Sequence, residues 1–342
     1  MSVTAETAMR LASCGIRLEE GVLGYSRTFT VKPAVMLRDG TRVAVKLFND
    51  MHRCNAHDVP EVRRSVRRAE PNPEEIAEYA REMNIAAGLD MNHPHLLRIL
   101  SFSDVPRDWL CCELLNANLY SYIRHGQPPW RARGTLFVKL LAPVASAVDF
   151  LHSKSYVHKD INSHHVLFMR DFSRVVLSGL KLSKSLVDVN FFLSSAKRGE
   201  IQWMDPECFE QPYSFESDVY SLGVILGELL TGETPHGTDA HGLVIARQMG
   251  GHPPFTLSQE IQTRWPRMSD LFHRTTVTAT SGARRGKRPS AKEFSKEVLR
   301  AAREDDKRRS REERELDEHL DAADGLHGRD EGPARDGKCV VQ

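Results

Sequence analysis

The sequence lacks the features that mark several large classes of protein. It contains no C-x-x-C pair, and its six cysteines are scattered except for the adjacent Cys111 and Cys112. No signal-peptide pattern opens it, and no unbroken apolar run approaches the ~18 residues that span a bilayer. We therefore expect reduced thiols in a cytosolic protein rather than a disulfide framework.

The sequence also lacks an excess of charge of either sign. Its 47 lysines and arginines against 46 aspartates and glutamates leave a net charge of +1. This balance gives no global electrostatic reason to expect nucleic acid as a partner. With 342 residues, 40% of them hydrophobic, the chain is long enough for a sizeable core in one large or two ordinary domains.

The informative features centre on the segment Tyr156–Lys184. His158-Lys159-Asp160-Ile161 is followed by two β-like runs, Val166–Phe168 and Val175–Leu177, joined by a polar turn. This layout resembles the catalytic loop and metal-binding loop of the protein kinases, H-R-D-L-x-x-x-N followed by D-F-G. The resemblance implies that Asp160 stands at the position of the catalytic base and that His158 supports the internal packing.

Two positions depart from the kinase pattern. His165 stands where the family has the catalytic-loop Asn, and Gly179 stands where it has the Asp of D-F-G. The resemblance implies that both side chains that hold Mg²⁺ are missing. Gly179 has no side chain to bind the ion, and His165 is a poor ligand for an ion that prefers oxygen. Without the metal, Asp160 has no activated phosphate to serve, so we interpret it as vestigial.

The start of the chain resembles a degraded glycine-rich loop, G-x-G-x-x-G-x-V. Gly21 and Gly24 fit its second and third glycines, Glu19 stands at the first, and Ser26 stands at the valine. Glycines there let backbone amides approach phosphates, whereas a glutamate at the rim disfavours a triphosphate. Two glycines are equally compatible with an ordinary hairpin turn.

The next segment resembles the strand that carries the kinase lysine. Asp39-Gly40 predicts a hairpin turn, and Val43-Ala44-Val45-Lys46 is similar to V-A-I-K. The resemblance implies that Lys46 points to the α- and β-phosphates and pairs with a helix glutamate. Glu82 is the expected partner, with Glu78 as the alternative.

The adenine site is expected around a strand and hinge at Asp108–Leu115. The resemblance implies that Cys112 is the gatekeeper and that Glu113 and Leu115 offer backbone groups to an adenine. Ala44 and Leu167 would enclose the ring from either side.

The second half of the chain carries the most specific motifs. Trp203–Glu207 is similar to W-M-A-P-E, with Asp205 for Ala, and Ser217–Gly232 closely resembles the tyrosine-kinase-like branch. The resemblance implies that Asp218 caps a buried helix and braces the catalytic loop. It also implies a buried ion pair between Arg288 and Glu207.

The remaining segments suggest contacts with membranes. A basic insertion at 53–68 contains Arg63, Arg64, Arg67 and Arg68, which would favour an anionic surface. The chain ends Cys339-Val340-Val341-Gln342, which fits C-a-a-X and predicts a farnesyl group on Cys339 in a eukaryotic host. A cysteine tail without lipid is the alternative. We expect a protein shared between the cytosol and the cytoplasmic membrane face.

These observations predict an α+β, two-lobed protein kinase-like fold, with a small antiparallel sheet and one helix in the N-lobe and a mainly helical C-lobe. The expected divisions are an N-terminal extension (1–15), the kinase-like domain (16–301, with N-lobe 16–112, hinge 113–116 and C-lobe 117–301), a charged helix (302–324) and a disordered tail (325–342).

The scaffold residues are kept while the metal ligands are lost, which is typical of a pseudokinase. We expect a signalling scaffold or allosteric regulator whose partners are signalling proteins, an active kinase among them, with no nucleic acid. ATP binding without Mg²⁺ stays open, since Lys46, Ala44 and Leu167 are intact. The alternatives are an active serine/threonine or tyrosine kinase of altered mechanism, and a degenerate copy that serves as a membrane adaptor through its tail.

Overall fold

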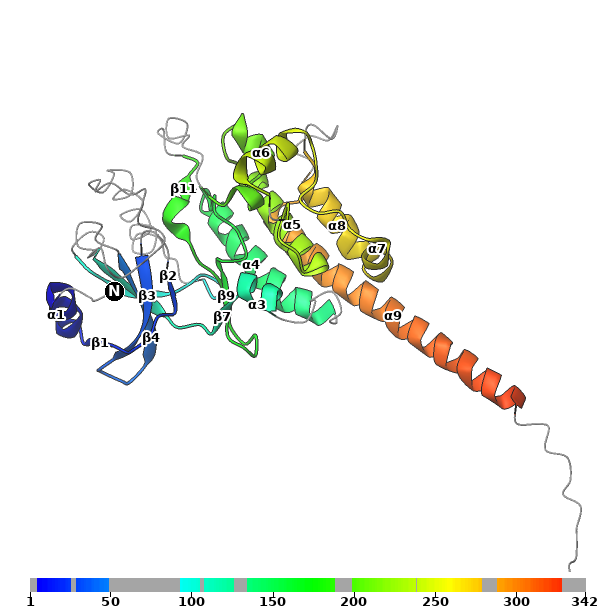
Figure 1. The fold of residues 1–342 in the computed structure, drawn as a ribbon, viewed down its shortest axis with the longest axis horizontal. Coiled ribbons are helices and arrows are strands. Elements are labelled where there is room, and N and C mark those ends of the chain that lie inside the picture. The colour runs from blue at the N-terminus through cyan, green and yellow to red at the C-terminus, as the bar shows by residue number, and fades with distance from the viewer. Residues whose placement is uncertain are drawn as a thin grey trace, which may run out of the picture.

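Two lobes of different secondary structure make up the chain, as the sequence predicts (Figure 1). The computed structural model describes residues 5–25, 29–48, 93–104, 108–125, 134–187, 199–237, 239–278 and 288–327. The N-lobe holds the larger antiparallel sheet, and the C-lobe is mainly helical.

The N-lobe sheet has the strand order β1-β3-β4-β6-β5, with β2 paired to β3. Asp39 and Gly40 form the turn between β3 and β4, where Asp39 Oδ1 accepts the Thr41 amide at 2.9 Å and Gly40 has φ 72°. The hairpin predicted from Asp39-Gly40 is therefore confirmed. The strands are β1 (Ile16–Leu18), β2 (Gly24–Tyr25), β3 (Phe29–Met36), β4 (Arg42–Phe48), β5 (Ile99–Phe102) and β6 (Trp109–Glu113).

The N-terminal segment belongs to the N-lobe and is not a separate extension. It forms helix α1 (Ala5–Ser13), whose Leu11 packs in one apolar cluster with Ile16 and Trp109. Arg10 and Thr7 both donate hydrogen bonds to the buried carboxylate of Asp108. The hydrogen bonds from Arg10 and Thr7 outweigh the effect of burial and hold the pKa of Asp108 below its ordinary value.

The C-lobe is organised around two buried helices, α4 and α5. Fourteen of the 17 residues of α5 are buried. Helix α4 is long and apolar enough to cross a membrane by composition alone, but half of it is buried within this lobe. The helices are α3 (Leu119–His125), α4 (Gly134–Ser153), α5 (Phe215–Thr231), α6 (His241–Met249), α7 (Gln259–Arg264), α8 (Pro266–Thr276) and α9 (Ala291–His327).

Short strands and 3₁₀ turns carry the loops between these helices. β7 (Ala117–Asn118), β9 (Val166–Phe168) and β10 (Val175–Leu177) form one antiparallel sheet, in the order β10-β9-β7. β8 (Tyr156–Val157) pairs with β11 (Lys184–Ser185). The two β-like runs that flank the predicted metal loop are therefore strands of one hairpin. The 3₁₀ turns are η2 (Leu180–Leu182), η3 (Ile201–Trp203) and η4 (Pro206–Phe209).

Helix α9 crosses the boundary that the sequence places at residue 301. It runs unbroken for 37 residues, packs Phe294, Val298 and Ala302 into the core, and then projects beyond the lobe (Figure 1). The expected charged helix (302–324) is therefore the continuation of a core helix, and it extends three residues into the segment expected to be disordered.

Two neighbouring acids of α9 satisfy the open amino ends of other helices. Asp306 Oδ1 accepts the Gly134 amide at the start of α4, at 3.1 Å. The Asp305 carboxylate accepts hydrogen bonds from the backbone amides of Arg267 and Met268 in the first turn of α8. Helix starts leave N–H groups without intrahelical partners and favour negative charge, so these acids are structural.

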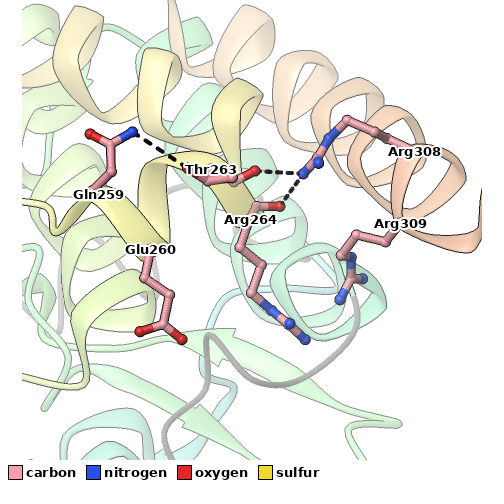
Figure 2. A pocket seen from close by; sticks show the side chains of 6 residues that line it. All are labelled: Gln259, Glu260, Thr263, Arg264, Arg308 and Arg309. Atoms are coloured by element: carbon pink, nitrogen blue, oxygen red, sulfur yellow. Dashed lines mark hydrogen bonds between the residues drawn. The ribbon is translucent and has the colours of Figure 1, made fainter. Parts of the chain in front are cut away.

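The next turn of α9 binds the carboxyl end of α7. Arg308 donates hydrogen bonds to the carbonyl oxygens of Thr263 and Arg264, each at 2.7 Å, and Figure 2 shows both bonds. The Arg309 guanidinium lies 4.2 Å from the centre of the buried Trp265 ring. The charged sequence therefore begins as part of the C-lobe.

Several predicted features lie outside the described residues. These are Ser26, both candidates for the lysine partner (Glu78 and Glu82), the basic insertion at 53–68, and the C-terminal Cys339.

Candidate functional site

Asp218 braces the loop that carries the predicted catalytic residues. Its carboxylate accepts the backbone amides of His158 at 2.8 Å and Lys159 at 3.0 Å, and a hydrogen bond from His152 at 2.9 Å. Burial alone raises the pKa of Asp218, but the hydrogen bond from His152 and the loop contacts outweigh it and lower the pKa. The bracing role is as predicted, whereas the helix cap is Ser214, which forms a capping box with Ser217.

His158 lies within this loop as a buried, uncharged ring. Its Nε2 lies 3.1 Å from the Ser178 carbonyl oxygen, and its Nδ1 accepts the Asp160 amide at 3.2 Å. Burial lowers the pKa of His158. The ring therefore links the catalytic loop to the strand end before Gly179.

Both carboxylate oxygens of Asp160 are already bound within the protein. Oδ2 lies 3.1 Å from His165 Nε2, and Oδ1 accepts the Asn162 side-chain amide at 3.0 Å. Burial raises the pKa of Asp160, but His165 outweighs it by charge and hydrogen bonding, so the pKa falls to about 2. Asp160 is thus ionised and held by its neighbours.

The imidazole of His165 lies against Gly179. A Cβ built on Gly179 would lie 2.7 Å from His165 Cγ and Nδ1, closer than real contacts allow. Gly179 also has φ 89°, a left-handed conformation that favours glycine. The two departures from the family pattern are therefore neighbours in space, and the histidine requires the glycine.

Lys46 lies among aromatic side chains on β4. Its Nζ is 4.5 Å from the centre of the Phe29 ring and 5.2 Å from that of Phe48. Such cation–π contacts are worth about 0.5–2 kcal/mol. Phe29 is the first residue of β3 and Phe48 the last of β4, so the ammonium group lies near this end of the two paired strands.

The predicted glycine-rich loop is placed differently by the strand pairing. Gly24 pairs with Val31 and Tyr25 with Thr30, so the chain reverses between Tyr25 and Phe29. Gly21, with φ 99°, interrupts the strand before this turn, and neither glycine lies within it. The predicted assignment of Gly21 and Gly24 is wrong by the register of this hairpin.

With the turn placed there, the spacing G-x-G-x-x-G-x-V falls on Gly24, Ser26, Phe29 and Val31. Only one of the three glycine positions then holds glycine. Glu19, expected at the phosphate rim, lies outside this spacing and binds Arg42 at 2.8 Å.

The predicted gatekeeper and its neighbours line the inner face of the sheet. Cys112 pairs with Ala44, and its Sγ lies 3.6 Å from the Ala44 carbonyl oxygen. Both belong with Leu110 to a small apolar cluster separate from the main cores. Leu167 lies half-buried on β9.

The hinge is held by a contact that the sequence analysis missed. Arg174, beside β10, donates to both carboxylate oxygens of Glu113 at 2.6 and 2.9 Å, and Glu113 also accepts the Arg98 amide at 2.9 Å. The Glu113 amide itself donates to the Arg98 carbonyl oxygen. Among the described residues no backbone hydrogen bond is formed by Leu114 or Leu115, so both hinge residues keep open backbone groups.

Arg288 binds Asp205 more closely than Glu207. Its guanidinium lies 2.7 Å from Asp205 Oδ2 with both side chains fully buried, while Glu207 Oε1 lies at 3.6 Å. The predicted pair with Glu207 is present but secondary. The signal was the Asp that replaces Ala in W-M-A-P-E, because it places a second carboxylate two residues before Glu207.

A second buried cluster joins the catalytic loop to the segment before α5. Glu228 accepts hydrogen bonds from Trp203 Nε1 at 2.7 Å, Ser163 Oγ at 3.0 Å and Arg124 at 3.2 Å. Burial raises the pKa of Glu228 to about 7. No local motif marks this contact, since its members come from four separate segments.

A family model described as protein tyrosine and serine/threonine kinase matches residues 62–262, which is more than half of the chain. The chain belongs to the protein kinase superfamily. The bracing of the catalytic loop by Asp218 and the order of strands and helices agree with this membership.

Three relatives illustrate how the kinase domain is shared. The chain is 28% identical over 193 residues to the serine/threonine-protein kinase PknJ of Mycobacterium bovis, covering 54% of this chain and 32% of that protein. The Raf homolog of Caenorhabditis elegans is 27% identical, with coverages of 49% and 21%. Mitogen-activated protein kinase kinase kinase 12 of Rattus norvegicus is 33% identical, with coverages of 43% and 16%.

The chain therefore spans about a third or less of the length of these relatives. The Raf and kinase-kinase-kinase relatives agree with the resemblance to the tyrosine-kinase-like branch.

The kinase family implies a Mg²⁺–ATP complex, and the residues at this site do not fit the metal. Gly179 offers no ligand, His165 offers nitrogen, and both oxygens of Asp160 are bound to side chains. Among the described residues no group of three His, Cys, Asp or Glu side chains is arranged to hold a metal ion.

Proposed function

We propose that this kinase domain is a pseudokinase, which acts as a scaffold or allosteric partner in signalling without Mg²⁺-dependent phosphotransfer. The observation that carries the proposal is the contact of His165 with Asp160 above Gly179. Phosphoryl transfer depends on positioning and on neutralising the phosphate charge, which kinases achieve with bound Mg²⁺. Here His165 replaces one metal ligand, and its ring fills the space beside Gly179, which replaces the other.

Three features support a scaffold role. The buried contacts of Asp218 with the catalytic loop and of Arg288 with Asp205 hold the C-lobe together. The Glu113–Arg174 pair joins the hinge to the strands of the C-lobe. A protein that serves as a binding surface needs these contacts but does not need the metal.

Nucleotide binding without metal is part of the proposal. Ala44, Cys112 and Leu110 supply an apolar surface, and the Leu115 backbone is open for an adenine. Lys46 provides a positive charge on the same strand as Ala44.

A thermal-shift titration with ATP tests the proposal, in Mg²⁺, in Mn²⁺ and in a chelator. We expect any rise in melting temperature to be the same in all three, and Lys46→Ala to reduce it. A rise that requires Mg²⁺ or Mn²⁺ would count against the pseudokinase assignment.

A matched pair of variants checks the metal site itself. Gly179→Asp together with His165→Asn should make the ATP shift depend on Mg²⁺, because the pair restores oxygen ligands and removes the ring that blocks the new Cβ. Gly179→Asp alone should lower the melting temperature without ligand by more than the pair does, since only there does the new Cβ collide with His165, whereas both carry a side chain at φ 89°.

The second candidate function is an active kinase of altered mechanism. The observation in its favour is that Asp160 is ionised, with a pKa of about 2, so it remains able to accept a proton from a hydroxyl. Phosphotransfer that needs no divalent metal and is lost in Asp160→Asn would support this candidate.

We also propose that Cys339 carries a prenyl group, so that the protein divides between cytosol and membrane. Intact-mass measurement on protein from eukaryotic cells tests this, and an unprocessed tail without added lipid mass would exclude it.

A further inference from the structure

One face of α9 carries a continuous row of basic side chains. They recur at intervals of three and four residues, which places them on one side of a helix with 3.6 residues per turn. All of them are exposed: Lys292, Lys296, Arg300, Arg303, Lys307, Arg311 and Arg314. We call this set the α9 basic face.

The α9 basic face points directly away from the C-lobe. The opposite side of the same helix is buried, with Phe294 and Val298 fully covered and Asp305 and Ala302 almost so. The row therefore lies on the outer side of α9, from its start in the core to Arg314 in the part that projects beyond the lobe.

The acids beside this row are mostly bound to other partners. Glu293 closes a capping contact with Ser290, and Glu297 binds Arg274 at 3.2 Å. Glu304 is the exception within the row, because it binds Arg300 at 2.8 Å as well as Arg267 at 3.0 Å.

Four members of the α9 basic face make no ion pair with a described residue, although Glu293 lies near enough to Lys296, and Glu304 to Lys307, to interact through charge. Within the part of the chain that the structure describes, no acid lies in ion-pair distance of Lys292, Lys296, Arg303 or Lys307. The row ends sharply, since residues 315–324 contain five acids and no lysine or arginine. The basic surface is therefore confined to one stretch of 292–314.

The shape of this surface limits what it can bind. It is the outer surface of one straight helix and is about 33 Å long at 1.5 Å per residue. A protein interface of that length usually has several apolar or aromatic anchors at its centre. Among the described side chains of 292–314 the only apolar one that is not buried is Leu299, which is half-buried between Lys296 and Arg303. Single-stranded nucleic acid is bound by aromatic stacking in a groove, and this row offers no aromatic side chain.

We propose that the α9 basic face binds the surface of a membrane rich in anionic lipid. Such a surface is flat and requires positive charge but no pocket and no apolar anchor. α9 then lies along the headgroups with the C-lobe above it. This site is distinct from the 53–68 insertion and does not depend on the pseudokinase assignment.

The hollow between α7 and α9 does not have the features of a separate ligand site. The hollow of about 370 Å³ between α7 and α9 is lined by Arg264, Arg308 and Arg309, but Arg308 is bound to backbone carbonyls and Glu260 faces the same space (Figure 2). It is on the side of α9 away from Lys296 and Arg303, so the two surfaces can be altered separately.

Vesicle sedimentation with the full chain, made in bacteria so that it carries no lipid, tests the proposal. The vesicles are phosphatidylcholine alone or phosphatidylcholine with phosphatidylserine. We expect binding only to the anionic vesicles, weakened by salt. Replacing Lys292, Lys296, Arg303 and Lys307 by Gln should weaken it by roughly two orders of magnitude, since each charge near an anionic leaflet contributes several-fold.

A control variant removes the same number of positive charges elsewhere. It replaces exposed residues on other elements by Gln: Arg17, Arg38, Lys154 and Arg170. The control should bind anionic vesicles within about two-fold of the wild type, since it leaves the α9 basic face intact. Unchanged melting temperatures of both variants show that folding is not the cause.

Three results would overturn the proposal. They are failure of the wild type to bind phosphatidylserine vesicles, equal loss in the control variant, and tighter binding to RNA or polyglutamate than to vesicles at matched charge. The last result would assign the α9 basic face to a soluble polyanion.

Discussion

Asp160 and His165 lie 3.1 Å apart, and this contact determines the charge of the catalytic loop. The folded pKa of Asp160, about 2, lies below the ordinary value of 3.8. Because the folded pKa is depressed, the pair stabilises the fold above pH ~4, and this contribution is lost as the pH falls towards 2. At neutral pH the base position is therefore a bound carboxylate.

Asp205 is the residue whose role differs most from the prediction. Asp205→Ala should lower the free energy of unfolding by about 3–5 kcal/mol, because it leaves the buried Arg288 guanidinium without its closest carboxylate. Glu207→Ala should cost less, since Glu207 lies at 3.6 Å. Urea denaturation of both variants measures the difference. An equal or larger loss of stability in Glu207→Ala would show that Glu207 is the main partner of Arg288, as the sequence predicted.

At the scale of elements, α9 holds three other helices through Asp305, Asp306 and Arg308. Truncation after residue 301, where the sequence places the end of the domain, should remove all three contacts. We expect this truncated protein to be insoluble or to melt at least 10 °C lower, since three lost caps at about 1 kcal/mol each shift the melting temperature by several degrees and the lost packing adds to this.

Truncation after residue 327 is the control for this experiment, because it keeps all of α9. Circular dichroism melting curves of both truncations provide the comparison. A stable, cooperatively folded chain that ends at residue 301 would show that α9 contributes little to the C-lobe.

Asp305 makes the helix contacts dependent on pH. Burial raises its pKa to about 6 from an ordinary 3.8, although Arg308 and Arg309 lie near, and its Oδ2 has no hydrogen-bond partner among the described residues. Since the folded pKa is raised, the folded state binds more protons between pH 3.8 and 6. Stability should therefore fall as the pH rises through that window.

Asp305→Asn should remove this pH dependence. Asn caps a helix about as well as Asp and carries no charge to bury. Above pH 6 the variant should equal or exceed the wild type in stability, by about 1–3 kcal/mol at most. Melting curves from pH 4 to 8 test this, and a variant that is less stable at pH 8 than the wild type would contradict it.

For the whole molecule, the sequence predicted the parts that depend on local patterns. The strands around Asp160, the Asp39-Gly40 hairpin and the buried helix at Asp218 each have a periodicity or motif of their own. The family model and the relatives confirm the kinase fold that these motifs indicated.

The parts that failed depend on pairing and packing contacts that no local motif specifies. The register of the glycine-rich hairpin is set by pairing of β2 with β3, which two glycines cannot specify. The contact of Arg288 with Asp205 joins residues 83 apart in the sequence. The continuation of α9 past residue 301 is held by packing on α4 and α8, and the charged sequence there concealed it.

The most direct test of the central claim is a phosphotransfer assay with the purified full chain. Wild-type protein and Asp160→Asn are incubated with labelled ATP, Mg²⁺ or Mn²⁺, and a generic protein substrate, and incorporation is measured on both the substrate and the chain itself. We predict that the wild type incorporates no more label than Asp160→Asn. Metal-dependent incorporation by the wild type that disappears in Asp160→Asn would contradict the account.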